Sequence, residues 1–141
     1  MAPMLALAGV PGRAQGTKIQ IYKDASCGCC SVWVTHLEQN GFAASVTNSP
    51  DMLAVKDSYG IPGQLRSCHT GVVNGYVVEG HVPAADIQRM LKEKPAVVGL
   101  AVPGMPIGSP GMEVPGMRPQ PFDVIAFEKG GARRVFASHN R

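Results

Sequence analysis

The sequence predicts a mixed α/β fold, and three observations support this prediction. Alternating apolar residues at 17–24 are typical of a strand, and apolar residues at three- and four-residue steps over 29–40 are typical of a helix. Asn74-Gly75 lies between two apolar runs, as in a β-hairpin. The chain has 141 residues, about one ordinary domain, which is enough for a core without disulfides.

The first strand is expected at 17–24, and a helix follows it. Asp24 or Ser26 can cap this helix, because short polar side chains accept hydrogen bonds from the free amides at a helix start. The helix covers about residues 29–40, and Gly41 is placed to end it.

A second strand and a second helix continue the alternation. The strand is expected at 42–47. Ser49 and Pro50 then provide an N-cap and a first-turn proline for a helix that stops at Gly60.

The hairpin at Asn74-Gly75 is the strongest local signal, since this dipeptide favours the two-residue turns that join antiparallel strands. Pro83 then begins a third helix, which ends before Pro95. The resulting order, β-α-β-α-β-β-α, is that of a thioredoxin-like fold with a proline-containing loop leading into the hairpin.

The last third of the chain differs in composition. Pro, Gly and Met dominate residues 102–121, which predicts a loop, and Pro-Gly-Met occurs there at 103–105, 110–112 and 115–117. Residues 122–127 and 132–138 flank a Lys-Gly-Gly segment and are expected to form a terminal β-hairpin. We therefore expect a thioredoxin-like domain at 15–101, with the Met-rich loop and terminal hairpin of 102–141 packed on it.

Residues 1–14 resemble the remnant of an export signal. A short apolar stretch from Met4 to Val10 precedes Gly12-Arg13-Ala14, a small-x-small pattern like that of a signal-peptidase site. Export delivers a domain to an oxidising compartment, so we expect a periplasmic location.

Composition argues against two classes of partner. The net charge is +3, from 13 Lys and Arg against 10 Asp and Glu, and no basic run interleaves with aromatic residues, so nucleic acid is not expected. No run reaches the roughly 18 apolar residues of a membrane span, so none is expected in the mature chain.

Three of the four cysteines lie in "CGCC" at 27–30. Cys27 and Cys30 have the C-x-x-C spacing of dithiol enzymes, but Cys29 would compete in the resolving step. Adjacent thiolates at a helix N-terminus can instead bridge soft metal ions. In a thioredoxin-like fold the loop carrying Cys68 packs against this turn, so we expect the four thiols to converge.

Several uses of these thiols remain open. The simplest interpretation is structural disulfides, for example Cys27 or Cys29 with Cys68. However, three cysteines within four residues are poorly placed to link distant segments of the chain. Zinc is less suitable because contiguous Cys29-Cys30 is poor geometry for one tetrahedral ion, and ferredoxin spacings are absent. Cu(I) favours soft sulfur and tolerates bridged coordination, so it fits best.

The histidines differ in their expected roles. His69 directly follows Cys68, so its ring is a candidate metal ligand or a hydrogen-bond partner of a thiolate. His81 is expected mainly to brace its loop through backbone hydrogen bonds, with a metal role as the second interpretation. His36 in mid-helix and His139 in the tail are expected to be solvated.

The methionines also divide into two groups. Met105 and Met112 lie in a loop with little structure to bury them, which favours a soft-metal role over packing for at least one of them. Met90 shares a helical period with apolar neighbours and is expected in the core, as is Met52.

These segments together carry a family resemblance. "CGCC" heading the helix with "WVTHLEQNGF", then "GIPGQLRSCHT", "GYVVEGHVPAADIQRML" and "GLAVPGMPIGSPGME", resemble the CopG-type periplasmic copper-resistance proteins from about Lys18 to Phe127. The resemblance implies a thioredoxin-like fold and a cysteine-bridged multinuclear copper site serving copper resistance, and it leaves open a change in copper's oxidation state. The residues that match its metal-binding cysteines or lie in its characteristic segments are Cys27, Cys29, Cys30, Cys68, His69, His81, Met105 and Met112.

The sequence thus predicts an exported protein whose partners are copper ions and other periplasmic copper-handling proteins. It would hold several Cu(I) ions through Cys27, Cys29, Cys30 and Cys68, with further ligands among His69, Met105 and Met112. The first alternative is a thiol-disulfide oxidoreductase in which Cys27 attacks and Cys30 resolves. The second is a passive copper chaperone or buffer. Whether the protein acts as a copper oxidoreductase is left open.

Overall fold

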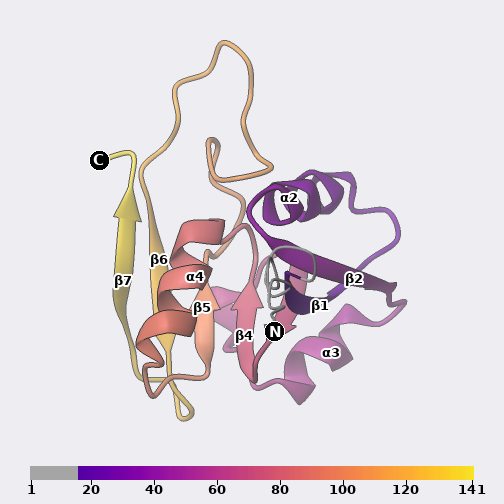
Figure 1. The fold of residues 1–141 in the computed structure, drawn as a ribbon, viewed down its shortest axis with the longest axis vertical. Coiled ribbons are helices and arrows are strands. Elements are labelled where there is room, and N and C mark those ends of the chain that lie inside the picture. The colour runs from indigo at the N-terminus through magenta and orange to yellow at the C-terminus, as the bar shows by residue number, and fades with distance from the viewer. Residues whose placement is uncertain (1–15) are drawn as a thin grey trace, which may run out of the picture.

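The computed structural model describes residues 16–141, which form a mixed α/β fold around one seven-stranded sheet (Figure 1). The expected export signal at 1–14 lies outside the described residues. In chain order the elements are β1 Thr17–Lys23, α2 Gly28–Gln39, β2 Phe42–Asn48, α3 Met52–Ser58, the 3-10 turn η2 Gly63–Leu65, β3 His69–Val73, β4 Tyr76–Glu79, α4 Ala84–Glu93, β5 Gly99–Ala101, β6 Phe122–Phe127 and β7 Arg133–His139. None of the described helices is both long and apolar enough to cross a membrane.

The sheet has the strand order β2-β1-β3-β4-β5-β6-β7. Two neighbouring pairs are parallel, β1 with β2 and β4 with β5, and the helices α2 and α4 make the crossover connections between them. The other neighbours are antiparallel.

The antiparallel pairing of β1 with β3 determines where the cysteines meet. Lys23, the last residue of β1, pairs with His69, the first residue of β3. The segment that leaves β1 and the segment that enters β3 therefore lie beside each other, at the same end of the two strands. One carries the cysteines of 27–30, and the other carries Cys68.

Apolar side chains cover both faces of the sheet. Trp33 of α2 and Ile87 of α4 belong to one large core cluster, and the residues that follow α3 pack in a second cluster. The neighbouring residues Val77 and Val78 of β4 fall in different clusters, because successive residues of a strand point to opposite faces. The sheet is therefore a central layer between two packed faces.

Several local expectations are confirmed. Asn74 and Gly75 join β3 to β4 with positive φ angles of 48° and 85°, as the two-residue hairpin requires. The terminal hairpin forms from β6 and β7. Met90 is fully buried, whereas Met52 is only half-buried. The three-residue strand β5 was not expected, since so short a run has no distinct period.

The expected helix caps are wrong for two helices. The N-cap of α2 is Cys27, not Asp24 or Ser26, because these two residues close a turn before the helix. The N-cap of α3 is Asp51, whose carboxylate accepts an amide hydrogen bond in the first turn. The hydroxyl of Ser49, the expected cap, instead accepts a hydrogen bond from the Asp51 amide.

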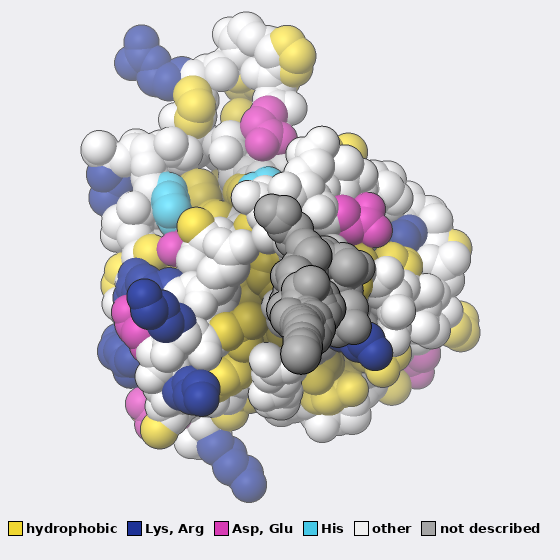
Figure 2. Space-filling model, in the orientation of Figure 1, with side chains coloured by type: hydrophobic (Ala, Val, Ile, Leu, Met, Phe, Trp, Pro, Cys, Tyr) yellow, Lys and Arg dark blue, Asp and Glu magenta, His cyan; other side chains and the backbone are white. Residues whose placement is uncertain are grey.

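Residues 102–121 hold no helix or strand in the structure and extend as a long loop between β5 and β6 (Figure 1). Part of this loop folds back toward α2, and the rest projects beyond the sheet. Hydrophobic side chains are visible on the projecting part (Figure 2), and the exposed large hydrophobic residues of the loop are Met105, Val114 and Met117.

Candidate metal centre

A tight turn between β1 and α2 presents the first three cysteines. The Asp24 carboxylate accepts hydrogen bonds from the amide and the hydroxyl of Ser26 at 2.8 and 2.6 Å. These bonds lower the pKa of the Asp24 carboxyl from its ordinary value. The Cys27 amide donates to the Asp24 carbonyl at 3.1 Å. Cys27 thus becomes the N-cap of α2, but its side chain makes no capping bond, so its sulfur is not engaged with the helix amides.

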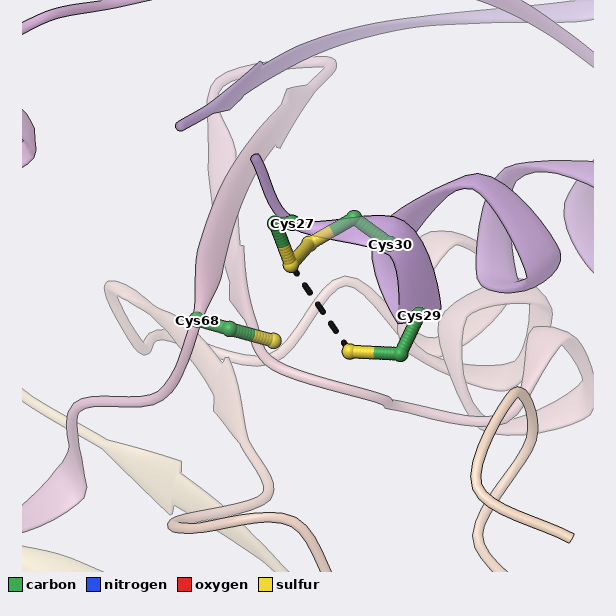
Figure 3. Close-up of side chains that lie close together, drawn as sticks. All are labelled: Cys27, Cys29, Cys30 and Cys68. Carbon is green, nitrogen blue, oxygen red and sulfur yellow. Dashed lines mark hydrogen bonds between the residues drawn. A yellow bond between two sulfur atoms is a disulfide. The ribbon is translucent and has the colours of Figure 1, made fainter. Parts of the chain in front are cut away.

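The four cysteine sulfurs converge (Figure 3), and all lie within 4.8 Å of one another. Cys27 and Cys30 form a disulfide, whereas Cys29 and Cys68 carry free thiols. The Cys29 sulfur lies 3.7 Å from the Cys27 sulfur. The disulfide is therefore within the C-x-x-C segment, and it is not one of the bridges to Cys68 considered from the sequence.

Two imidazole rings border the sulfurs, and both are fully buried. The Nδ1 atom of His69 lies 3.2 Å from the Cys68 sulfur and 3.3 Å from the Cys30 sulfur. The Nε2 atom of His81 lies 3.3 Å from the Cys68 sulfur. Cys68, His69 and His81 therefore form a second group of potential ligand atoms that shares one sulfur with the cysteine group.

Burial controls the charge of these groups. It lowers the pKa of His69 to about 3, with a smaller contribution from His81. It also lowers the pKa of His81, so both rings are neutral, which is the form that binds metal ions. Burial raises the pKa of the Cys68 thiol to about 11. This sulfur therefore keeps its proton near neutral pH until a cation favours the thiolate.

The loop after β5 orients the His81 ring. Nδ1 of His81 lies 2.7 Å from the carbonyl oxygen of Pro110. A carbonyl can only accept, so Nδ1 donates its proton there and Nε2 presents a lone pair toward Cys68. Gly111 has a φ of +93° and packs so closely that an added Cβ would lie 2.9 Å from Nδ1 of His81.

The same loop brings a thioether to the cluster. The Met105 sulfur lies 3.8 Å from the Cys29 sulfur. Met112 is half-buried, and its hydrogen bonds are those of its backbone, with Gly108 and Ser109. Of the two methionines singled out from the sequence, the structure brings Met105 to a cysteine sulfur.

Trp33 supports the site from within the core. Its indole Nε1 donates to the Val82 carbonyl at 2.9 Å, and its ring centroid lies 4.2 Å from that of His69. The Nε2 atom of His69 is buried and has no hydrogen-bond partner among residues 16–141. Packing against Trp33 and the contacts of Nδ1 therefore set the orientation of this ring.

Two histidines that were expected in solvent make specific contacts instead. Nε2 of His36 accepts a hydrogen bond from the Ala84 amide at 3.0 Å, and burial lowers the pKa of His36. Nε2 of His139 lies 2.7 Å from the Asp86 carboxylate, and its ring stacks on Phe122. Both contacts join α4 to distant parts of the chain, so no local pattern could indicate them.

His81 lies at the site, although its sequence context favours a bracing role. The register of the β3–β4 hairpin is a sequence signal that places His81 at the site. In the β3–β4 register Thr70 pairs with Glu79, and continuing this register outward places Cys68 opposite His81. The Asn74-Gly75 turn predicts the same register, so the pair could have been found from the sequence.

Comparisons with known proteins were consistent with this fold and site. A solved structure of the copper resistance protein CopG, form 1, is 47% identical with a TM-score of 0.83, and the match covers 90% of this chain and 100% of that chain. Form 2 is 48% identical with a TM-score of 0.84, covering 89% and 100%. A family model described as "Protein of unknown function, DUF411" matches residues 65–112. A comparison with curated proteins gave no match.

The fold and site define a mixed α/β protein with a cysteine and histidine cluster able to bind a metal ion. The identity and coverage show that the chain belongs to the family of the copper resistance protein CopG. The segment matched by the family model includes Cys68, His69, His81 and Met105.

Proposed function

We propose that this protein serves copper resistance by holding several Cu(I) ions in a cysteine-bridged site. The observation that carries the proposal is the convergence of four cysteine sulfurs within 4.8 Å. Both related structures are of a copper resistance protein, which supports copper as the metal. The proposed ligands are Cys27, Cys29, Cys30, Cys68, His69, His81 and Met105.

The number of donor atoms favours more than one ion. Four sulfurs of cysteine, two imidazole nitrogens and one thioether border the site. A single tetrahedral ion uses four donor atoms, so one ion would leave several of these atoms without a metal. Thiolates can bridge two soft ions, and sulfur with imidazole suits Cu(I).

The C-x-x-C disulfide supports a link to copper's oxidation state. When the Cys27 and Cys30 thiols are oxidised to the disulfide, they give up two electrons and two protons. Those two electrons suffice to reduce two Cu(II) ions to Cu(I), and the reverse step needs an electron donor that returns both thiols. Reduced Cys27 and Cys30 would then join Cys29 and Cys68 as ligands. Interconversion of copper oxidation states is therefore part of the proposal.

The same disulfide favours a second candidate, a thiol-disulfide oxidoreductase. In that function Cys27 attacks a substrate and Cys30 resolves the mixed disulfide. The free thiol of Cys29, 3.7 Å from the Cys27 sulfur, is close enough to compete in that step. A passive copper chaperone or buffer would share the metal site but not the redox step.

We also propose a thioredoxin-like domain at 15–101, extended by residues 102–141. The connection β1-α2-β2-α3-β3-β4-α4 and the strand order β2-β1-β3-β4 support this assignment. A periplasmic location is proposed from residues 1–14 and from the use of a disulfide. Other periplasmic copper-handling proteins are the proposed partners that deliver or receive copper.

A Cys29→Ser variant separates the two leading functions, with Ser31→Ala as the matched control on an exposed part of the same helix. If copper binding is the function, Cys29→Ser lowers copper occupancy of the reduced protein and Ser31→Ala does not. If disulfide chemistry is the function, insulin-disulfide reduction is substantial in the parent, survives in Cys29→Ser and stops when copper binds. That second result would replace the copper proposal with the oxidoreductase.

A further inference from the structure

Glu79 is a charged side chain buried beside the segment that carries Cys68. Its Oε2 atom accepts hydrogen bonds from the Lys56 ammonium at 2.5 Å and from the Ser67 amide at 2.8 Å. Its Oε1 atom accepts from the Thr70 hydroxyl at 2.6 Å, and Lys56 also donates to that hydroxyl oxygen at 2.9 Å. Glu79 is 0% exposed and Lys56 is 5% exposed.

Stability alone does not explain the buried ion pair of Lys56 and Glu79. Removing two charges from water is costly, and buried ion pairs can often be replaced by apolar residues without loss of stability. The informative contact is the hydrogen bond that the Glu79 carboxylate accepts from the Ser67 amide. Ser67 immediately precedes Cys68.

Ser67 connects the buried carboxylate to two sulfur-bearing segments. Its amide is held by Glu79, and its hydroxyl donates to the carbonyl of Gly104. The residues that follow these two anchored positions are Cys68 and Met105. The Cys68 sulfur contacts both histidines of the site, and the Met105 sulfur contacts Cys29.

We infer that Glu79 is a positioning residue of the copper site, which acts through Ser67 to fix the segments that carry Cys68 and Met105. Its relevance to copper rests on the proposed function. The positioning of the Cys68 thiol does not, and it can be measured without metal. Residues that orient metal ligands typically contribute roughly 10- to 100-fold to metal affinity.

Two double variants remove the buried charges together and differ at one acceptor. In Lys56→Met/Glu79→Gln, the amide oxygen can still accept from the Ser67 amide. In Lys56→Met/Glu79→Leu, the side chain at position 79 has no atom that can accept from the Ser67 amide. Each protein is kept with its Cys27–Cys30 disulfide intact, so that only Cys29 and Cys68 react with iodoacetamide. Mass spectrometry gives both alkylation rates, and each is compared with its rate in the parent.

The inference predicts that the Leu variant raises the Cys68 rate several-fold over that of the parent and that the Gln variant stays near the parent. An unchanged Cys68 rate in the Leu variant, or equal increases of this rate in both variants, overturns it. Amide hydrogen exchange in the parent supplies a test that needs no variant to fold. The Ser67 amide should be strongly protected, and exchange at the rate of an exposed loop would also overturn the inference.

Copper affinity completes the test. With reduced proteins and a Cu(I) chelator as competitor, the Leu variant should bind Cu(I) roughly 10- to 100-fold more weakly than the Gln variant. If the Cys68 rate rises in the Leu variant but the parent binds no Cu(I), the positioning role is retained and the proposed function is rejected. Equal Cu(I) affinities in two variants with different Cys68 alkylation rates would reject the role of Glu79 in the copper site.

Discussion

The sulfur of Cys29 lies 3.8 Å from the sulfur of Met105, although 76 positions separate the two residues in the chain. The contact exists because the loop after β5 folds back over the start of α2. A neutral thioether is a weaker ligand for a soft ion than a thiolate and does not need to lose a proton. If the site holds Cu(I) as proposed, Met105 is suited to the entry and release of the ion.

Replacing Met105 by Leu should change the rate at which Cu(I) is loaded and transferred, while copper still binds. Leu has a similar volume and should leave the fold intact, because volume-conserving apolar changes usually cost less than about 1.5 kcal/mol. Met112→Leu is the matched control in the same loop. Stopped-flow transfer to a Cu(I) chelator, beside thermal melts, measures both variants. Transfer rates that are equal for Met105→Leu, Met112→Leu and the parent would assign Met105 to packing.

The Cys27–Cys30 disulfide withholds two of the four cysteine sulfurs from any metal. The oxidised protein should therefore bind fewer Cu(I) ions than the reduced protein. Copper content after anaerobic loading, measured with and without prior treatment with a phosphine reductant that is then removed, gives the comparison. The same copper content in both preparations would show that these two sulfurs are not ligands.

Gly111 and Gly116 offer a paired test of the loop that covers His81. Both have positive φ, 93° and 83°, but an added Cβ meets His81 and Trp33 at Gly111 and open space at Gly116. Gly116→Ala should cost only the backbone strain, about 1–2 kcal/mol. Gly111→Ala should cost more and should accelerate copper release, because it displaces the Pro110 carbonyl from His81. Urea unfolding and chelator-driven release measure the two effects, and indistinguishable variants would refute this role of the loop.

Stability should fall in mild acid, and His36 should contribute to this fall. Burial lowers its pKa from the ordinary value of 6.5 in the folded chain, where its neutral Nε2 accepts from the Ala84 amide. Below pH 6.5 the unfolded chain therefore binds more protons than the folded chain, and the free energy of unfolding decreases as the pH falls toward the folded-state pKa. Urea unfolding from pH 8 to pH 5 should show a smaller decrease for His36→Gln than for the parent. Identical slopes would remove His36 from this explanation.

Most of the element order could be predicted from the sequence because its signals are local. The turn at Asn74-Gly75 depends on the backbone freedom of two residues, and the alternation in β1 depends on side chains two positions apart. The strand β5 could not be predicted in this way. It has three residues and exists because it pairs with β4 and β6, which only the tertiary fold brings beside it.

In the candidate site, too, the features with local sequence signals could be predicted and those created by the tertiary fold could not. Convergence of the cysteines could be predicted because three lie within four residues and the fourth enters the neighbouring strand. The Cys27–Cys30 pairing could not be predicted, since three thiols within reach of one another do not identify a partner. The Met105 contact depends on how a Pro- and Gly-rich loop folds back, and that path has no period in the sequence.

The number of Cu(I) ions bound per chain tests the central claim most directly. Protein reduced anaerobically, loaded with excess Cu(I) and freed of unbound metal should contain more than one copper per chain by elemental analysis, and zinc should compete poorly. The reason is that the donors around the four cysteine sulfurs exceed those that one ion can use. A stoichiometry of one, or a preference for zinc over Cu(I), would contradict the account.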